Sequence, residues 1–187
     1  MAWAWIENGN IFVAYSKDVA PTDAIEVPEG TQPDELEWDG QNLRLKSQEQ
    51  IQAEKLLKSK QEKLKQVSQS FEDTITNGHF FSQSLQIEVD CRRSDIKNDL
   101  QNVENLITFL TSTNTQAIEV YRGYTNPETS ITQYAYNVTL EQLQQLKLEM
   151  IQYGLQLYNR KWQLEDAIAN AQSQSELDAI SIDFNNL

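Results

Sequence analysis

The chain has 187 residues, of which 39% are hydrophobic, and it carries a formal net charge of -13 at pH 7. This length suits one ordinary domain, or a small domain beside a larger one. A chain this acidic repels the phosphates of nucleic acids and the surfaces of anionic membranes. We therefore expect neither nucleic acid nor membrane among its partners.

The sequence shows no sign of a secretory signal or a membrane span. Its first ten residues, MAWAWIENGN, contain no basic region and no long apolar run, and nothing approaches the roughly 20 apolar residues of a spanning helix. The single cysteine, Cys91, cannot form an internal disulfide. These features predict a protein that folds in cytoplasm.

The charge is distributed in three segments. Residues 1–46 hold three basic and nine acidic side chains, residues 47–76 hold five of each, and residues 77–187 hold seven and fourteen. The hydrophobic pattern changes at the same places. We therefore expect a small β-rich head over residues 1–46, a long connecting helix over 47–77, and an α+β body over 78–187.

The head reads as short strands separated by turns. Two β-prone runs flank Asn8-Gly9, and a second pair flanks Asp39-Gly40; both dipeptides favour tight hairpin turns. The run A-I-E-V-P predicts a further short strand that ends at the proline. The head is thus expected to contain two hairpins and one additional strand.

A module of fewer than 50 residues buries little surface alone, so its aromatic residues have two possible uses. They form a small core, or they form a face that anchors a partner protein. For the second reading the candidate partner-binding residues are Trp3, Trp5, Phe12, Tyr15 and Trp38. The sequence leaves both readings open.

The connecting segment is predicted to be a helix because it contains no glycine or proline up to Asn77-Gly78. Its apolar seam repeats at alternating spacings of four and three, as in a coiled coil: Ala53, Leu57, Lys60, Leu64, Val67 and Phe71. Such a seam requires another helix. That helix comes from a second copy in a dimer or trimer, or from the body of the same chain. The segment is then either an exposed rod or an ordinary surface helix.

In the body, the pattern predicts three strands and three helices. Residues 84–90 alternate as a strand, and residues 92–111 have helical spacing with Asp90 or Ser94 as the cap. Two more strands are expected over 117–124 and 130–138. Capping boxes at Thr139 and Ser173 begin a long helix to about residue 171 and a short final one. These elements predict a three-stranded sheet covered by helices, which is an α+β fold.

Cys91 is the candidate for chemistry, since it lies between a predicted strand and helix beside two arginines. A helix N-terminus and cationic neighbours lower a thiol pKa, but a nucleophile also needs a base, and the sequence suggests no pairing with His79. One cysteine and one histidine cannot complete a zinc site. We expect no enzyme activity, no cofactor and no metal. An interchain disulfide at Cys91 remains open, and Arg92 and Arg93 are expected to pair with Asp90, Asp95 or Glu88.

Several stretches resemble proteins associated with the tail fibres of phages and prophages. V-D-C-R-R-S-D-I-K-N-D-L-Q-N-V-E-N-L-I is similar to the signature of a C-terminal domain found in phage tail proteins, whose chemistry is not established. V-Y-R-G-Y-T-N and the T-L-E-Q helix ending in L-Y-N-R-K-W follow in the same order. In the head, A-I-E-V-P and E-W-D-G-Q-N-L resemble short proteins encoded beside tail fibres.

This resemblance, which covers nearly the whole chain, implies a tail-fibre assembly chaperone or adaptor without catalytic residues. The partner would be a phage tail fibre protein, bound at its tip or attachment region. The place of action would be the cytoplasm of the infected bacterial host during assembly, or the virion tail. Two other readings are a structural tail or baseplate component that attaches the fibre or binds a receptor, and a small enzyme. No residue is assigned a role by the resemblance.

Overall fold

The computed structural model describes residues 1–184 and has an α+β fold, with about 48% helix and 26% strand. The chain divides into two compact units, Met1–Ser59 and Lys60–Leu187. The boundary lies inside the long helix α1, so each unit takes part of that helix. This division differs from the three segments expected from the charge pattern, in which the helix forms a part of its own.

The first unit contains two small antiparallel sheets, one of three strands in the order β2-β1-β3 and one formed by β4 and β5. Their bounds are Ala2–Glu7 (β1), Asn10–Ala14 (β2), Ile25–Val27 (β3), Leu36–Trp38 (β4) and Leu43–Leu45 (β5). Two short 3-10 helices, η1 (Lys17–Val19) and η2 (Pro33–Glu35), lie between strands. The predicted hairpins and the additional strand are thereby confirmed.

The turns of these hairpins depend on residues that tolerate a positive φ. Asn8 and Gly9 have φ values of 51° and 79°, and this pair of left-handed residues closes a tight hairpin whose twist matches its strands. In the second hairpin Gly40 has a φ of 97°, and the Asp39 carboxylate accepts hydrogen bonds from the backbone N–H groups of Gln41 and Asn42. Both turns therefore follow from local sequence alone.

Helix α1 (Gln48–Asn77) begins with a reciprocal cap. The Gln50 backbone N–H donates to Ser47 Oγ at 3.1 Å, and the Ser47 backbone N–H donates to Gln50 Oε1 at 2.8 Å. The helix was predicted over nearly these bounds. Its first turns belong to the first unit, where Lys55 forms an ion pair with Glu35 at 3.2 Å.

The predicted seam of α1 is packed in only one half of the helix. Ala53 and Leu57 are exposed, whereas Val67 and Phe71 are fully buried in the second unit. Phe71 contacts the ring of Tyr158 on helix α3 (Leu140–Asn170) at a centroid distance of 5.0 Å. The partner of this half is therefore a helix from the body of the same chain. Self-association through residues 47–76 stays a prediction, and it would use the exposed half.

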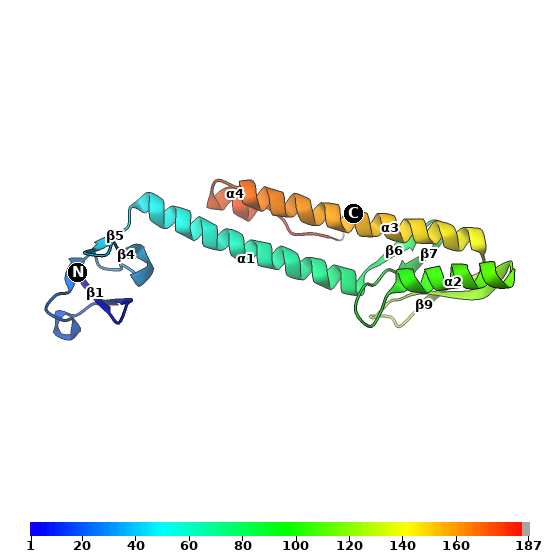
Figure 1. The fold of residues 1–187 in the computed structure, drawn as a ribbon, viewed down its shortest axis with the longest axis horizontal. Coiled ribbons are helices and arrows are strands. Elements are labelled where there is room, and N and C mark those ends of the chain that lie inside the picture. The colour runs from blue at the N-terminus through cyan, green and yellow to red at the C-terminus, as the bar shows by residue number, and fades with distance from the viewer. Residues whose placement is uncertain (185–187) are drawn as a thin grey trace. The chain divides into compact units, whose positions relative to one another are not determined.

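Over its described residues, the second unit contains two hairpins and three further helices beside its share of α1 (Figure 1). The bounds are His79–Ser82 (β6), Ile87–Asp90 (β7), Asp99–Thr113 (α2), Ala117–Thr125 (β8), Thr132–Thr139 (β9) and Gln174–Ala179 (α4). β6 pairs with β7, and β8 pairs with β9, each antiparallel. Up to residue 184 the body thus has four strands in two two-stranded sheets, instead of one three-stranded sheet.

The predicted strand over residues 84–90 is wrong in its first half. Ser84 to Gln86 form a turn in which Gln86 has a φ of 57°. The Glu149 carboxylate on α3 fixes this turn by accepting from Ser82 Oγ at 2.6 Å and from the Ser84 backbone N–H at 3.0 Å. A tertiary contact 65 residues away in sequence therefore overrides the local alternation.

The predicted start of α2 at about residue 92 is also wrong. The helix begins at Asp99, and its cap is Asn98, whose side chain accepts from the Gln101 backbone N–H. Neither Asp90 nor Ser94 caps it. Residues 93–98 form a small loop closed by a bridge between Arg93 and Asn98, and Ile96, which lies in the range predicted to be helical, is 93% exposed.

Helix α3 organises the core of the second unit. Its capping box joins Thr139 and Gln142 as predicted, and its buried residues face α2 and the two hairpins. The core consists of apolar side chains from all of these elements: Leu85, Val89, Val103, Leu110, Val138, Leu143, Leu146 and Met150. Ser173 caps α4 as predicted, but the Glu176 carboxylate accepts from the Gln172 backbone N–H instead of closing a reciprocal box.

Candidate functional site

The strand β1 presents small residues to the core and large aromatic residues to the other side. Ala2 and Ala4 are completely buried against Val27 and Leu36. Because neighbouring side chains along a strand point to opposite faces, Trp3 and Trp5 lie on the face away from this core. The tryptophans predicted to form either a core or a binding face therefore do not form the core of the first unit.

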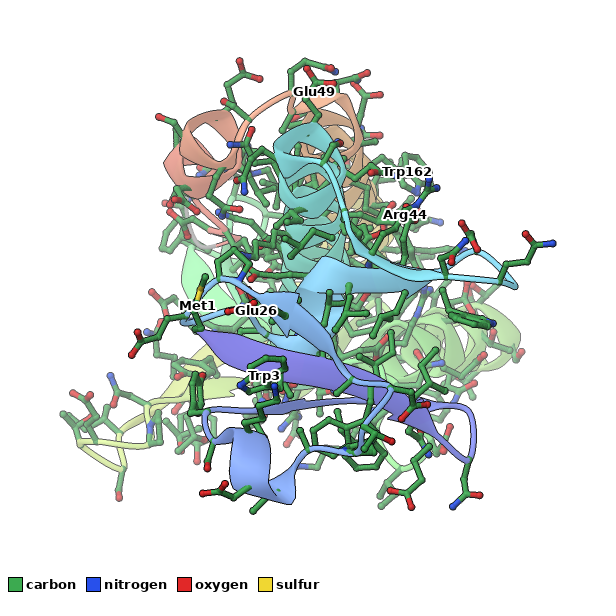
Figure 2. All side chains as sticks on the ribbon, turned by 90° about the vertical axis from the view of Figure 1, so that its left-hand side faces the viewer. Met1, Trp3, Glu26, Arg44, Glu49 and Trp162 are labelled. Atoms are coloured by element: carbon green, nitrogen blue, oxygen red, sulfur yellow. The ribbon has the colours of Figure 1, made fainter. Side chains whose placement is uncertain are left out.

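Phe12 on β2 completes this face. It pairs directly with Trp5 across the two strands, and the two rings stack with centroids 5.6 Å apart at 19°. The Lys17 ammonium lies 4.7 Å from the centre of the Trp3 ring, close enough for a cation–π contact. We call Trp3, Trp5 and Phe12 the aromatic face. Figure 2 labels Trp3 and, on the adjacent strand β3, Glu26, which pairs with it in register.

The other two candidate residues of the head lie outside this cluster. Tyr15 follows the end of β2 and is 62% exposed, and Trp38 lies in the second sheet and is 51% exposed. Within residues 1–184, no ring contact joins either of them to the aromatic face. The structure therefore brings together three of the five predicted residues.

A shallow cleft of about 410 Å³ begins at Trp5 and continues over the segment that contains η1. Its wall includes the exposed Val19 and three carboxylates, Glu7, Asp18 and Asp23. Apolar rings beside carboxylates suit a partner that offers apolar side chains together with basic or hydrogen-bond-donating groups. Periodicity alone does not predict this cleft, because η1 and the loop around it have no regular spacing.

Cys91 lies at the end of β7 and packs partly buried against the core of the second unit. Its thiol points toward the Met150 backbone carbonyl, with the sulfur 3.9 Å from the oxygen. Burial raises the pKa of the Cys91 thiol to about 12, and the carboxylate of Asp99 adds to the effect. This environment disfavours ionisation of the thiol, so it does not favour the reactive thiolate that the sequence analysis considered. The interchain disulfide stays a prediction, and the same environment disfavours it.

Arg92 connects the end of β7 to the start of α2. Its guanidinium forms two bonds to the Asp99 carboxylate, at 2.9 and 3.2 Å, and lies 2.8 Å from Asp90. The Arg92 backbone N–H also donates to Asp99 at 2.8 Å. The pairing with Asp90 was predicted, but Asp99 was missed, and no local pattern distinguishes it from the other acidic residues. Burial raises the pKa of Asp90 despite the attraction of Arg92.

His79 is engaged elsewhere and does not serve as a base for Cys91. Its ring stacks on Tyr124 with centroids 3.8 Å apart, and its Nε2 lies 3.8 Å from the Glu88 carboxylate. Across residues 1–184, no group of three or more histidine, cysteine, aspartate or glutamate side chains is arranged to hold a metal ion. In the same range no helix is both long and apolar enough to cross a bilayer.

The sequence did not predict the clefts that the described residues of the second unit form. A broad one of about 770 Å³ lies between the C-terminal part of α1, β6 and α3, and its lining mixes aromatic rings with amide side chains, among them Phe81 and Gln152. Another of about 700 Å³ lies over β8 beside Asp90 and Asp99. A narrower groove of about 170 Å³ lies between the β7–α2 corner and α3.

The chain matches no protein-family model, and no curated protein or solved structure is significantly similar to it.

Proposed function

We propose that this chain is a non-enzymatic, bacteriophage tail-fibre-associated protein, an assembly chaperone or adaptor that binds the fibre through the aromatic face of its head. The observation that carries the proposal is the arrangement of β1, which directs Trp3 and Trp5 away from the core that Ala2 and Ala4 form. Large aromatic side chains on a non-core face are typical anchors of protein interfaces.

The aromatic face combines solvent exposure with rings whose positions are already fixed. Phe12 is 40% exposed although it stacks on Trp5, and Trp3 and Trp5 are partly buried, so the face is assembled within the chain and is open to solvent mainly at Phe12. Stacked rings lose little conformational entropy when a partner covers them, because their rotamers are already restricted. A rigid aromatic face of this kind suits the apolar tip of an elongated fibre protein awaiting assembly.

A non-catalytic role is supported by the state of the candidate reactive groups. The raised pKa of the Cys91 thiol keeps it protonated near neutral pH, and His79 is stacked on Tyr124. The tail-fibre assignment itself rests on the resemblance of the sequence stretches described above. In this proposal the protein acts in the cytoplasm of the infected host.

Co-expression with the tail fibre protein encoded nearest to this chain tests the proposal. We expect fibre that is insoluble alone to become soluble with the chain, and size exclusion with light scattering to show a complex of defined stoichiometry. Fibre that folds equally well alone and forms no complex would contradict the proposal. Detection of the chain in purified particles would favour the structural tail component instead.

A further inference from the structure

The groove between the β7–α2 corner and α3 lies entirely within the second unit. It is lined by apolar groups of Ile75, Leu100, Met150 and Leu155, and Gly154 on α3 is part of the lining. Its volume of about 170 Å³ is well below the roughly 300–1,000 Å³ of small-molecule sites. A space of this size fits a single apolar side chain. We call it the Gly154 groove.

Gly154 is an unusual residue for its position, the middle of a helix of 31 residues. Glycine destabilises a helix interior by roughly 1 kcal/mol relative to alanine. A Cβ placed on Gly154 would meet no atom within 4 Å, so packing inside the chain does not require glycine there. The absence of a side chain at Gly154 makes the groove deeper.

Beside the groove, α3 exposes a stripe of apolar residues in addition to its buried face. Leu148, Ile151, Leu155 and Trp162 follow one another at spacings of three, four and seven, and Leu155 and Trp162 are 56% and 57% exposed. Tyr158, partly buried, fills the position between the last two. This spacing is that of a coiled-coil seam, so the surface fits another amphipathic helix. Trp162 is labelled in Figure 2.

The charges at this surface differ from those of the chain as a whole. The thirteen residues that line the groove include Arg92 and Arg93 and no carboxylate, although the chain has 28 acidic against 15 basic residues. Along α3 no acidic residue occurs from Met150 to Leu164, and the carboxylate of the preceding Glu149 is bound by Ser82 and Ser84 of the β6–β7 turn. Arg92 is paired with Asp90 and Asp99, but within residues 1–184 no carboxylate pairs with Arg93. Arg93 is exposed and belongs to the lining of the groove.

We propose that the Gly154 groove and the α3 stripe form a second docking surface, which binds an acidic amphipathic helix of a partner protein. One large apolar side chain of that helix occupies the groove over Gly154. Its neighbouring apolar residues cover Ile151, Leu155 and Trp162, and a carboxylate reaches Arg93. This inference does not depend on the aromatic face of the head, so the chain would offer two separate surfaces, as an adaptor requires.

The probe is a fluorescein-labelled helical peptide of roughly 18 residues, long enough to be partly helical alone. It carries leucine at the seam positions and glutamate at the flanking positions, and the matched peptide carries lysine in place of each glutamate. Binding to the full chain is followed by fluorescence anisotropy. We expect the glutamate peptide to bind at least tenfold more tightly than the lysine peptide.

Two pairs of variants locate the site. Gly154→Leu fills the groove with a helix-favouring side chain and is expected to weaken binding tenfold or more, whereas Gln163→Leu, on an exposed position of the same helix, leaves it unchanged. Arg93→Glu is expected to weaken binding about tenfold, the loss of one charge-assisted contact. Lys97 lies in the same loop but outside the groove. Lys97→Glu makes the same change of charge and should change the affinity for the peptide by less than about twofold.

Circular dichroism confirms that each variant is folded. Equal affinity for the two peptides, no binding of either at about 100 μM, or full binding by folded Gly154→Leu would overturn the proposal. Light scattering of the chain alone gives a further check. Self-association that Gly154→Leu abolishes would assign the surface to a second copy and would likewise overturn it.

Discussion

The contact between Arg92 and Asp99 holds the corner where β7 leads into α2. Asp99 is 9% exposed and accepts three hydrogen bonds from Arg92, one from the backbone and two from the guanidinium. Removing one partner of a largely buried ion pair leaves the other charge poorly solvated. We therefore expect Asp99→Ala to lower the free energy of unfolding by about 3 kcal/mol, measured by urea denaturation.

The control for this change is Glu104→Ala on the same helix. Glu104 forms an ion pair with Lys147 at 2.9 Å, but both side chains are partly exposed. A pair that water still reaches contributes less than about 1 kcal/mol. If the two variants lost equal stability, the corner would not depend on the buried contact that the structure shows.

A second prediction about a single residue concerns the thiol of Cys91. Its pKa of about 12, against an ordinary value of 9.0, lowers the thiolate fraction at pH 8 about 1,000-fold. The thiolate is the species that reacts with Ellman's reagent. In the folded chain, Cys91 should therefore react far more slowly than free glutathione does. In the chain unfolded by urea, it should react at a rate similar to that of glutathione. A native reaction as fast as that of glutathione would show an accessible, ionised thiol and would favour the interchain disulfide.

We expect the substitution of alanine for glycine to have opposite effects on stability at two positions of the second unit, Gly154 in α3 and Gly123 in β8. Gly154→Ala should stabilise the chain by about 0.5–1 kcal/mol, because alanine favours α3 and the added Cβ meets nothing. In β8 a Cβ on Gly123 would lie 2.4 Å from the Glu88 carbonyl oxygen and 2.8 Å from the Ile87 side chain. Gly123→Ala should therefore separate the two hairpins and destabilise the unit. Thermal unfolding followed by circular dichroism distinguishes the two, and a destabilised Gly154→Ala would contradict the packing described for α3.

Elements controlled by local signals were predictable from the sequence. The hairpin at Asn8-Gly9, the cap at Thr139 and the long helices each depend on residues close together in the chain. The corner from residue 84 to 99 was not predictable, because distant partners determine it. Glu149 holds the turn at Ser84, and Asp99 delays the start of α2 by pairing with Arg92.

The candidate surfaces also depend partly on local sequence, which is predictable, and partly on distant residues, which are not. Alternation along a strand puts Trp3 and Trp5 on the same face of β1, but their direction away from the core depends on Val27 and Leu36 packing against the alanines. The Gly154 groove could not be predicted, since its walls come from α1, the β7–α2 corner and α3. Only the heptad spacing of Leu148, Ile151 and Leu155 was a signal, and it is hidden among the buried residues of α3.

For the whole molecule, the buried titrating groups predict loss of stability in alkali. Burial raises the pKa of Cys91, Tyr121 and Tyr153, so the unfolded chain releases these protons first. The stability they provide is complete below their ordinary values of 9.0 and 10.0 and falls as the pH rises above them. Each group removes up to about 1.4 kcal/mol per pH unit.

Urea denaturation between pH 8 and 11 measures this decline. Tyr121→Phe removes one of the buried protons and should make the decline shallower above pH 10. Tyr136→Phe, at an exposed position on β9, controls for the loss of a hydroxyl group. An unfolding free energy that stays constant up to pH 11 would show that these side chains are not buried as described.

The most direct test of the proposed function combines fibre co-expression with a change to the aromatic face. In the double variant Trp5→Thr with Phe12→Thr, residues that favour strands replace the stacked rings, so the hairpin should be retained. Tyr134→Thr with Tyr136→Thr, which removes exposed rings from β9 in the other unit, is the matched control. We predict that the wild-type chain and the control keep the tail fibre protein soluble in a defined complex, while the aromatic-face variant, folded by circular dichroism, does not. Fibre that stays soluble and bound with the folded aromatic-face variant would contradict the account.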